Sequence, residues 1–171
     1  LREKVTESWA FEKPPKDTTE FANELIEAMW KNSGLGVSAN QLGYNYRVFA
    51  MRGETKKESI VCFNPQIKDF SPEMNTMEEG CLSLPDVFAK VVRPEHVAIS
   101  YHNSDGVVEG QLASGLTARV FQHELDHLDG ILFIDRIGEL TKNRAFDKAR
   151  KIQKFRARGK PKYQYSTKFA L

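Results

Sequence analysis

The chain has 171 residues, of which 40% are hydrophobic and 28% are charged, and its formal net charge is +2. These values suit one globular domain, spanning 1–171, that can bury a core. No apolar run is long enough to cross a membrane and no signal-peptide hydrophobic region opens the sequence, so we expect no membrane contact. Two cysteines, Cys62 and Cys81, are too few for a secreted disulfide scaffold, which leads us to expect a reducing, cytoplasmic compartment.

The first half of the chain predicts an irregular arm, one helix and several strands. Residues 1–16 are polar and contain a Pro-Pro pair, which indicates an arm without regular structure. Asp17 and Glu20 resemble a capping box, and apolar residues follow at helical spacing until about residues 32–34. Strand-like runs then occur at 47–51, 59–63, 87–92, 97–101 and 106–113.

The second half predicts a central helix and a C-terminal helix. Gly130 suits the position just past the end of the central helix. That helix carries one stripe, at spacings of four, three and four, made by Leu116, Val120, His123 and His127. After the apolar run 131–135, a last helix is expected at about 141–158, with a narrow apolar stripe of Phe146, Ala149, Ile152 and Phe155. Strands grouped ahead of a buried helix predict an α+β fold, with small mixed or antiparallel sheets packed around the central helix.

The segment QHELDHLDG, at 122–130, contains His-Glu-x-x-His, a signature of metal hydrolases. On a helix, His123 and His127 lie on one face and can direct two imidazoles at one cation. Glu124, beside them, suits the handling of a proton from metal-bound water. Ordinary helix residues would seldom show this register by accident, because histidine is uncommon. The motif therefore predicts a catalytic metal site.

The residues alone leave the third metal ligand open. The third histidine of the pattern H-E-x-x-H-x-x-G-x-x-H is replaced by Phe133, which cannot ligate a metal. One alternative is Cys81 in EEGCLSLP, since a thiolate binds iron or zinc strongly, and Gly80 would let the backbone approach a metal or substrate. The other alternative is a downstream carboxylate, with candidates Asp129, Asp135, Glu139 and Asp147.

A glycine-rich stretch, GLGVSANQLG at 34–43, reads by itself as a turn between helix and strand. Taken together and in this order, GLGVSANQ, EGCLS and QHELDH resemble the three signature motifs of the peptide deformylase family. The resemblance runs from about Phe21 to the C-terminal helix. It departs from the family at Ser38, where a small alanine is usual, and we expect altered local hydrogen bonding with activity retained. The N-terminal arm also lacks a strand-like opening.

The resemblance implies a reaction and the residues that perform it. Peptide deformylases remove the formyl group from the N-terminal formyl-methionine of new bacterial or organellar proteins. The implied metal ligands are Cys81, His123 and His127, with a metal-bound hydroxide attacking the formyl carbon. Glu124 would take the water proton and deliver it to the departing amine. The side-chain amide of Gln41 and the backbone N–H of Leu82 would stabilise the oxyanion.

The resemblance also suggests how substrate and metal are bound. The peptide would lie extended against Leu35-Gly36 and form strand-like hydrogen bonds. Val120 and Leu116, one and two turns before His123, suit the walls of a methionine pocket, although plain core packing explains them equally well. We expect Fe²⁺ in the cell and Zn²⁺, Ni²⁺ or Co²⁺ in a purified sample.

The C-terminal stretch from Lys142 to Lys162 carries ten basic residues against one acid, Asp147. This pattern fits a solvated helix face or a contact with ribosomal RNA phosphates, and the resemblance favours the ribosome. We expect a monomer in the cytoplasm, in an organelle stroma or matrix, or in host cytoplasm if the gene is viral. Two rival hypotheses are a zinc metallopeptidase with a downstream carboxylate ligand and a non-catalytic, ribosome-binding relative.

Overall fold

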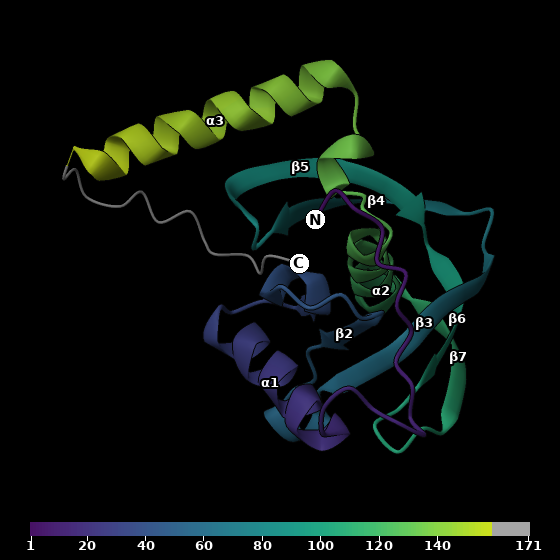
Figure 1. The fold of residues 1–171 in the computed structure, drawn as a ribbon. Helices are drawn as coiled ribbons and strands as arrows, with labels where there is room; N and C mark the ends of the chain where they lie inside the picture. The colour runs from purple at the N-terminus through teal and green to yellow at the C-terminus, as the bar shows by residue number, and fades with distance from the viewer. Residues whose placement is uncertain (159–171) are drawn as a thin grey trace.

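The computed structural model describes residues 1–158 and contains helices on both sides of an antiparallel β region (Figure 1). The α-helices are α1 (Thr18–Lys31), α2 (Gly115–Leu128) and α3 (Glu139–Ala157), and the short 3-10 helices are η1 (Ala39–Leu42), η2 (Lys56–Glu58) and η3 (Phe133–Asp135). The strands are β1 (Gly36–Ser38), β2 (Val48–Met51), β3 (Ile60–Phe70), β4 (Met74–Cys81), β5 (Leu84–Pro94), β6 (His96–His102) and β7 (Val108–Ser114). The predicted α+β class is confirmed.

The strands form two sheets in which every ladder is antiparallel. Five strands pair in the order β1-β2-β3-β6-β7, and β4 and β5 form a separate two-stranded sheet. Strands β2, β6 and β7 lie where the sequence predicts them, whereas β3 and β5 run several residues further. The sequence does not predict β4 or β1. The segment MNTMEEGC has few residues of high β propensity, so its extended form depends on pairing with β5 along its whole length.

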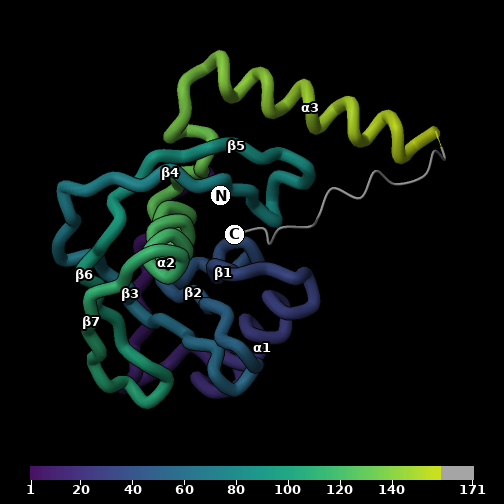
Figure 2. The backbone as a smooth tube through the Cα atoms, turned by 180° about the vertical axis from the view of Figure 1, so that it is seen from behind, coloured from purple at the N-terminus to yellow at the C-terminus, as the bar shows by residue number. Residues whose placement is uncertain are grey.

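Helix α2 lies between the two sheets and is the centre of the molecule (Figures 1 and 2). One core cluster packs between α2 and the five-stranded sheet, where the rings of Phe49 and Phe121 meet edge to face at 5.0 Å. The predicted stripe holds for Val120, His123 and His127, which are buried, but Leu116 is 53% exposed. Leu116 belongs to the first turn of α2, where the helix enters from the sheet edge at β7.

The C-terminal end of α2 has the predicted glycine in a left-handed conformation. Gly130 has φ +78°, and its N–H donates to the carbonyl of His127 at 3.2 Å. The N–H of Ile131 donates to the carbonyl of Asp126 at 2.8 Å. These two bonds make a Schellman motif, which satisfies the last carbonyls of the helix that carries the histidines.

The N-terminal arm is irregular, as predicted, but it is packed against the domain. The N–H of Val5 donates to the carbonyl of Leu128 at 2.8 Å. Trp9 is buried and stacks on Phe21 of α1 with ring centroids 4.9 Å apart. The predicted N-cap of α1 is confirmed, because the Asp17 carboxylate accepts from the Glu20 N–H at 2.8 Å.

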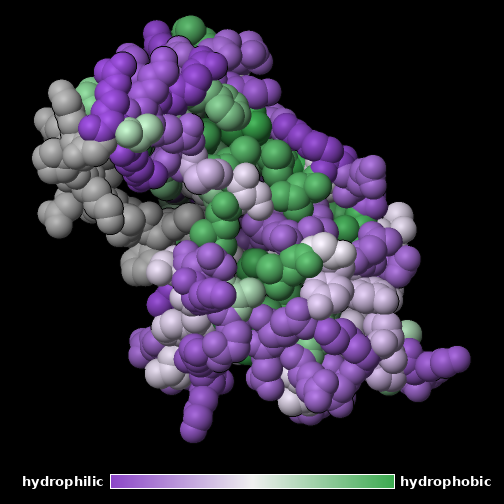
Figure 3. Space-filling model, turned by 60° about the vertical axis from the view of Figure 1, so that its left-hand side comes forward, coloured by the Kyte–Doolittle hydropathy of each residue, from purple (hydrophilic) through white to green (hydrophobic). Residues whose placement is uncertain are grey.

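Helix α3 packs on β5 through Ala145 and Ala149, which are buried. Phe155, which was expected in the apolar stripe, is 57% exposed, because it lies near the end of α3, beyond the buried Ala145 and Ala149, where the helix reaches past the body (Figure 1) and contacts β5 through the Arg156–Asp86 ion pair. The apolar run 131–135 contains η3, whose Phe133 and Ile134 are buried. Figure 3 shows a mostly hydrophilic surface in the region of α3. Lys160 and Lys162 of the basic stretch lie outside the described residues, and no helix within 1–158 is long and apolar enough to cross a membrane.

Candidate metal centre

Two local structures bring the three predicted metal ligands together. Cys81 is the last residue of β4, directly before a tight two-residue turn into β5. His123 and His127 are one turn apart on α2 and face that turn. The Cys81 Sγ lies 3.2 Å from the His127 Nε2. One donor atom from each of the three residues lies within 4.8 Å of the other two, and all three residues are buried.

The ring nitrogens of the histidines are arranged for ligation. The Glu79 carboxylate, which can only accept, lies 3.0 Å from Nδ1 of His123 and so holds the proton on that nitrogen. The other ring nitrogen, Nε2 of His123, is buried and without a hydrogen-bond partner among the described residues, and it is the nitrogen available to a metal. Burial lowers the pKa of His127 to about 3, and the neighbouring His123 contributes to the shift. His127 is therefore neutral, the form that binds metal.

A buried network of charges holds Glu79 in place. Arg93 donates to both Glu79 oxygens, at 2.7 and 2.9 Å, and Arg119 donates a third bond at 2.8 Å. Burial alone would raise the pKa of Glu79, but the hydrogen bonds from Arg93 and His123 lower it well below the usual range. Arg93 also reaches Asp126 of α2 at 2.6 Å. A carboxylate that orients a ligating histidine in this way fixes its ring and raises its basicity.

The donor set fits a divalent metal ion. Burial raises the pKa of the Cys81 thiol to about 11, so an empty site would hold the thiol. Binding a cation would release that proton, and the negative charge of the resulting Cys81 thiolate would offset the cost of burying the cation. One sulfur and two imidazole nitrogens suit zinc or ferrous iron and leave a fourth position open. The buried, unpartnered Nε2 of His123 is explained by such an ion.

Glu124 lies beside the ligands, and its carboxyl is close to the Ser38 side chain. Its side chain is fully buried, and no arginine or lysine among the described residues pairs with its oxygens. Burial raises the pKa of Glu124 well above its usual value; hydrogen bonding with the Ser38 side chain opposes this shift, and the charge of Glu79 adds to it. A Cβ at Gly36 would lie 2.4 Å from Oε1 of Glu124, so this close approach requires glycine. A carboxyl of raised pKa in this position can both take and give a proton near neutral pH.

Gln41 presents its amide nitrogen to the ligand cluster. Its Oε1 accepts from the Ser38 N–H at 2.8 Å and from the Ser38 hydroxyl at 3.1 Å. The amide nitrogen therefore points the other way, toward Oγ of Ser83 at 3.1 Å and Sγ of Cys81 at 3.8 Å. The hydroxyl of Ser38 takes part in this arrangement, through a bond that an alanine side chain at this position could not make.

The predicted substrate-binding residues differ in their burial and in the segments that they contact. Gly36 belongs to β1, an edge strand of the five-stranded sheet, and the carbonyl of Leu35 accepts from the Arg52 N–H at 2.8 Å. Gly80 contacts β5, because the ring of Phe88 fills the space that a Cβ would take. Leu82 is partly buried, and its side chain packs over Gly34. Val120 is buried in the core beneath the histidines, and Leu116 is exposed.

The downstream carboxylates are engaged elsewhere. Asp129 pairs with Arg47 at 2.9 Å, and Asp135 accepts from the Leu132 N–H at 2.8 Å. Asp147 pairs with Arg150 on the surface of α3, and Glu139 is exposed in the first turn of that helix. Within residues 1–158 the metal-binding group contains Cys81 and no carboxylate, so the ligand set of the metallopeptidase hypothesis is wrong.

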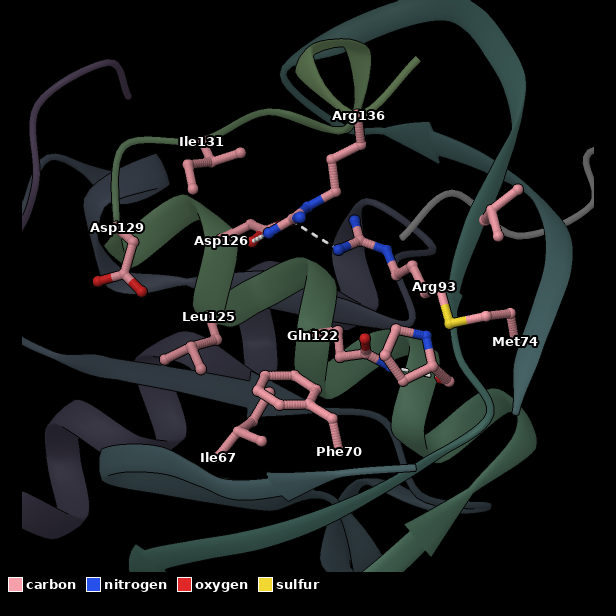
Figure 4. A pocket seen from close by; sticks show the side chains of 12 residues that line it. Ile67, Phe70, Met74, Arg93, Gln122, Leu125, Asp126, Asp129, Ile131 and Arg136 are labelled. Atoms are coloured by element: carbon pink, nitrogen blue, oxygen red, sulfur yellow. Dashed lines mark hydrogen bonds and ion pairs between the residues drawn. The ribbon is translucent and has the colours of Figure 1, made fainter. Parts of the chain in front are cut away.

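A separate pocket of about 300 Å³ lies on another face of α2 (Figure 4). Arg93 and Arg136 both reach Asp126 there, the latter at 2.6 Å, opposite a wall that includes Phe70 and Leu125. None of the three metal ligands lines this pocket. The charged network therefore lies between the pocket and the metal centre.

Sequence reasoning missed the residues that support the ligands, namely Glu79, Arg93, Arg119 and Asp126. The position of Glu79 near the metal site could have been predicted, because residues two apart on a strand share a face and Glu79 precedes Cys81 by two. This prediction required β4 to be recognised as a strand. The two arginines have no local pattern that distinguishes them from surface residues, since their role depends on contacts between distant segments.

Comparison with known proteins agrees with this geometry. The sequence model described as polypeptide deformylase matches residues 1–143. A peptide deformylase from a Picosynechococcus strain is 40% identical over 120 residues, covering 68% of this chain and 64% of that protein, and one from Brucella suis is 40% identical over 141 residues, covering 80% of each. The crystal structure of a Synechococcus elongatus peptide deformylase in complex with actinonin has a TM-score of 0.79 at 33% identity, covering 87% of this chain and 80% of that one. A Plasmodium falciparum peptide deformylase structure has a TM-score of 0.79 at 30% identity, covering 92% of each chain.

Proposed function

Because the chain belongs to the polypeptide deformylase family, it is a metal-dependent hydrolase of N-formyl peptides, and we propose that its substrate is the formyl-methionine that begins newly made polypeptides. The observation that carries this proposal is the Cys81, His123 and His127 cluster with the buried Glu124 carboxyl beside it. We propose Fe²⁺ as the metal in the cell, on the basis of the sulfur-containing ligand set, which also accepts zinc, nickel or cobalt.

When bound, the metal ion supplies Lewis acidity and lowers the pKa of a water ligand. Glu124 accepts the proton of the attacking water and transfers it to the nitrogen of the departing peptide amine. Its burial beside the metal ligands supports this role, because within the described residues no arginine or lysine pairs with its oxygens and fixes its charge. Its raised pKa lets the same group serve first as base and then as acid.

Charge develops on the formyl oxygen as the water adds, and this oxygen needs donors that are already in place. We assign them to the Nε2 amide of Gln41 and the backbone N–H of Leu82. The support for Gln41 is its fixed orientation, with the amide nitrogen 3.8 Å from Cys81. The support for Leu82 is its position directly after that ligand, in the turn between β4 and β5.

The peptide is proposed to bind along β1. As an edge strand, β1 has backbone groups that can pair with an extended peptide near Leu35-Gly36. Val120 is the better candidate for a wall of the methionine pocket, because it is buried next to the histidines, while the exposed Leu116 suits a position at the pocket rim. Gly80 supports the pocket indirectly by allowing Phe88 to pack close to the ligand strand.

A second proposal concerns the ribosome. Of the ten basic residues in the C-terminal stretch, eight lie between Lys142 and Arg158, on or directly after α3, which extends from the body (Figure 1). A protruding basic helix suits contact with RNA phosphates without obstructing the metal centre. On this proposal the enzyme acts as a monomer in the compartment where translation occurs.

The direct test is hydrolysis of a short formyl-Met peptide, with the metal identified in the same anaerobically purified protein. The matched control substrate is the acetyl-Met peptide, whose extra methyl group the site should reject. We expect turnover of the formyl peptide alone and about one metal ion per chain. Absence of turnover with a fully loaded site would favour the non-catalytic, ribosome-binding hypothesis.

A further inference from the structure

Ser38 is a completely buried polar residue near the metal centre, and it is neither a predicted metal ligand nor a predicted catalytic group, nor one of the charged residues around Glu79. It is the last residue of β1 and directly precedes η1, the short helix that carries Gln41. Two residues earlier on β1, Gly36 makes the close approach to Glu124. Ser38 therefore lies at the junction between the strand that touches the proton-transfer group and the helix that supplies an oxyanion donor.

Two hydrogen bonds of Ser38 converge on one atom, while its side chain also interacts with the Glu124 carboxyl. Its backbone N–H and its hydroxyl both donate to Oε1 of Gln41, at 2.8 and 3.1 Å. A carbonyl oxygen has two lone pairs, so these two donors use its full accepting capacity. The backbone N–H already excludes the flipped amide, because flipping would place two donors against each other. The hydroxyl adds a second anchor on the same atom.

We propose that the Ser38 hydroxyl is a positioning group for deformylation, which holds the Gln41 amide with Nε2 directed toward the formyl oxygen. Two effects follow from the double anchor. The side chain loses rotational freedom before the substrate arrives, so less ordering is needed in the transition state. Donation to Oε1 also polarises the amide and strengthens its N–H groups as donors. The inference rests on the proposed role of Gln41 and goes beyond it, because it assigns the orientation of that residue to a second side chain.

The test is a double-mutant cycle of Ser38→Ala and Gln41→Met, with kcat and KM measured on a formyl-Met peptide. Ser38→Ala should lower kcat about three- to tenfold and leave KM unchanged, since a group that acts in the transition state alters kcat. This range corresponds to about 0.6–1.4 kcal/mol, the size of one neutral hydrogen bond. In the Gln41→Met background the same substitution should have no effect on kcat.

Thr55→Ala is the matched control, because Thr55 directly precedes η2 and its N–H donates to a side-chain oxygen three residues further on, Oε2 of Glu58, at 2.9 Å. Its kcat should equal that of the wild type. Metal content and the free energy of unfolding, measured for all variants, should show that Ser38→Ala is folded and loaded.

Three outcomes are decisive. A normal kcat for Ser38→Ala overturns the inference. An equal loss in both backgrounds also overturns it, since the hydroxyl would then act on something other than Gln41. A normal kcat for Gln41→Met alone rejects the role of Gln41 and the inference together, while the deformylase assignment, which is tested by turnover of the wild type, stands.

Discussion

At the residue scale, Glu124 is the group whose burial beside the metal ligands predicts a chemical role. Glu124→Gln keeps the shape of the side chain but cannot take a proton from water. We expect the metal to stay bound while turnover falls by at least about a hundredfold, the lower range for positioned acid–base groups. Metal analysis and peptide turnover on one preparation check this. Near-normal turnover would mean that another group transfers the proton.

Cys81 makes a complementary prediction about the metal itself. Cys81→Ala removes the only ligand that brings negative charge, and two neutral imidazoles hold a divalent cation weakly. The purified variant should contain little metal and show no turnover, whereas Cys62→Ala, at the other buried cysteine, should keep both. Full metal occupancy in Cys81→Ala would remove this residue from the ligand set.

Glu79 connects the ligands to the buried charges. Glu79→Gln leaves the guanidinium groups of Arg93 and Arg119 without their shared counter-ion, which typically costs about 3–5 kcal/mol of unfolding free energy. It also replaces the carboxylate beside His123 Nδ1 with a neutral amide, which holds the Nδ1 proton less strongly, and we expect metal affinity to fall roughly 10–100-fold. Denaturant unfolding and competition with a metal chelator measure the two effects.

The neighbouring Glu78 gives a control for that experiment, because it lies on the opposite, exposed face of β4. Glu78→Gln should change the free energy of unfolding by no more than about 0.5 kcal/mol and leave metal affinity unaltered. Similar losses of unfolding free energy and metal affinity in both variants would show that the effect comes from the charge of the segment and not from the contacts of Glu79.

At the element scale, α2 depends on the turn that ends it. Gly130→Ala places a side chain at φ +78°, with its Cβ 3.0 Å from the carbonyl oxygen of Arg2. The left-handed conformation alone costs about 1–2 kcal/mol. We expect the midpoint of urea unfolding to decrease by a corresponding amount, with an unchanged slope.

Gly110 on β7 is the matched glycine, because its Cβ would meet only ordinary contact, 3.4 Å from the carbonyl oxygen of Ile99. Gly110→Ala should therefore shift stability by no more than about 0.5 kcal/mol. If Gly130→Ala changes the free energy of unfolding as little as Gly110→Ala does, the Schellman turn does not limit the stability of α2. The N-terminal arm that packs on Gly130 would then have to shift at little cost in free energy.

At the scale of the whole molecule, charge reversal on α3 can test whether this helix binds the ribosome while the rest of the domain carries out hydrolysis. Changing Arg150, Lys154 and Arg158 to glutamate should lower ribosome affinity about tenfold or more, and the wild-type affinity should fall steeply with salt as counterions are released. Turnover of a short formyl-Met peptide should stay near wild type, because α3 contributes none of the metal ligands. Co-sedimentation over a salt series and peptide turnover check the two expectations.

A control variant with the same net charge separates a specific surface from overall charge. Lys13, Lys31 and Lys57 are exposed and lie outside α3, and their reversal to glutamate changes the net charge equally. This variant should bind ribosomes almost as well as wild type. An equal loss of ribosome affinity in both variants would mean that net charge alone explains the effect. Lost peptide turnover in the α3 variant would mean that this helix supports the structure of the catalytic site.

The sequence by itself determined the features that depend on local spacing. The i, i+4 register of His123 and His127, the N-cap at Asp17 and the glycine at Gly130 each follow from residues within one or two turns of a helix, so pattern and structure agree. The family resemblance added Cys81 as the third ligand, which the residues alone left open. Apolar alternation likewise located β2, β6 and β7.

Only the tertiary structure decided which distant residues meet. Strand β4 is extended because β5 pairs with it, and Glu79 is a charged core residue because Arg93 and Arg119 approach from other segments. The exposure of Leu116 and Phe155 depends on where α2 and α3 leave their packing surfaces. The physical reason is common to all of these residues. Burial and charge pairing are properties of contacts between segments far apart in the chain, and the free energy of such contacts exceeds local preference.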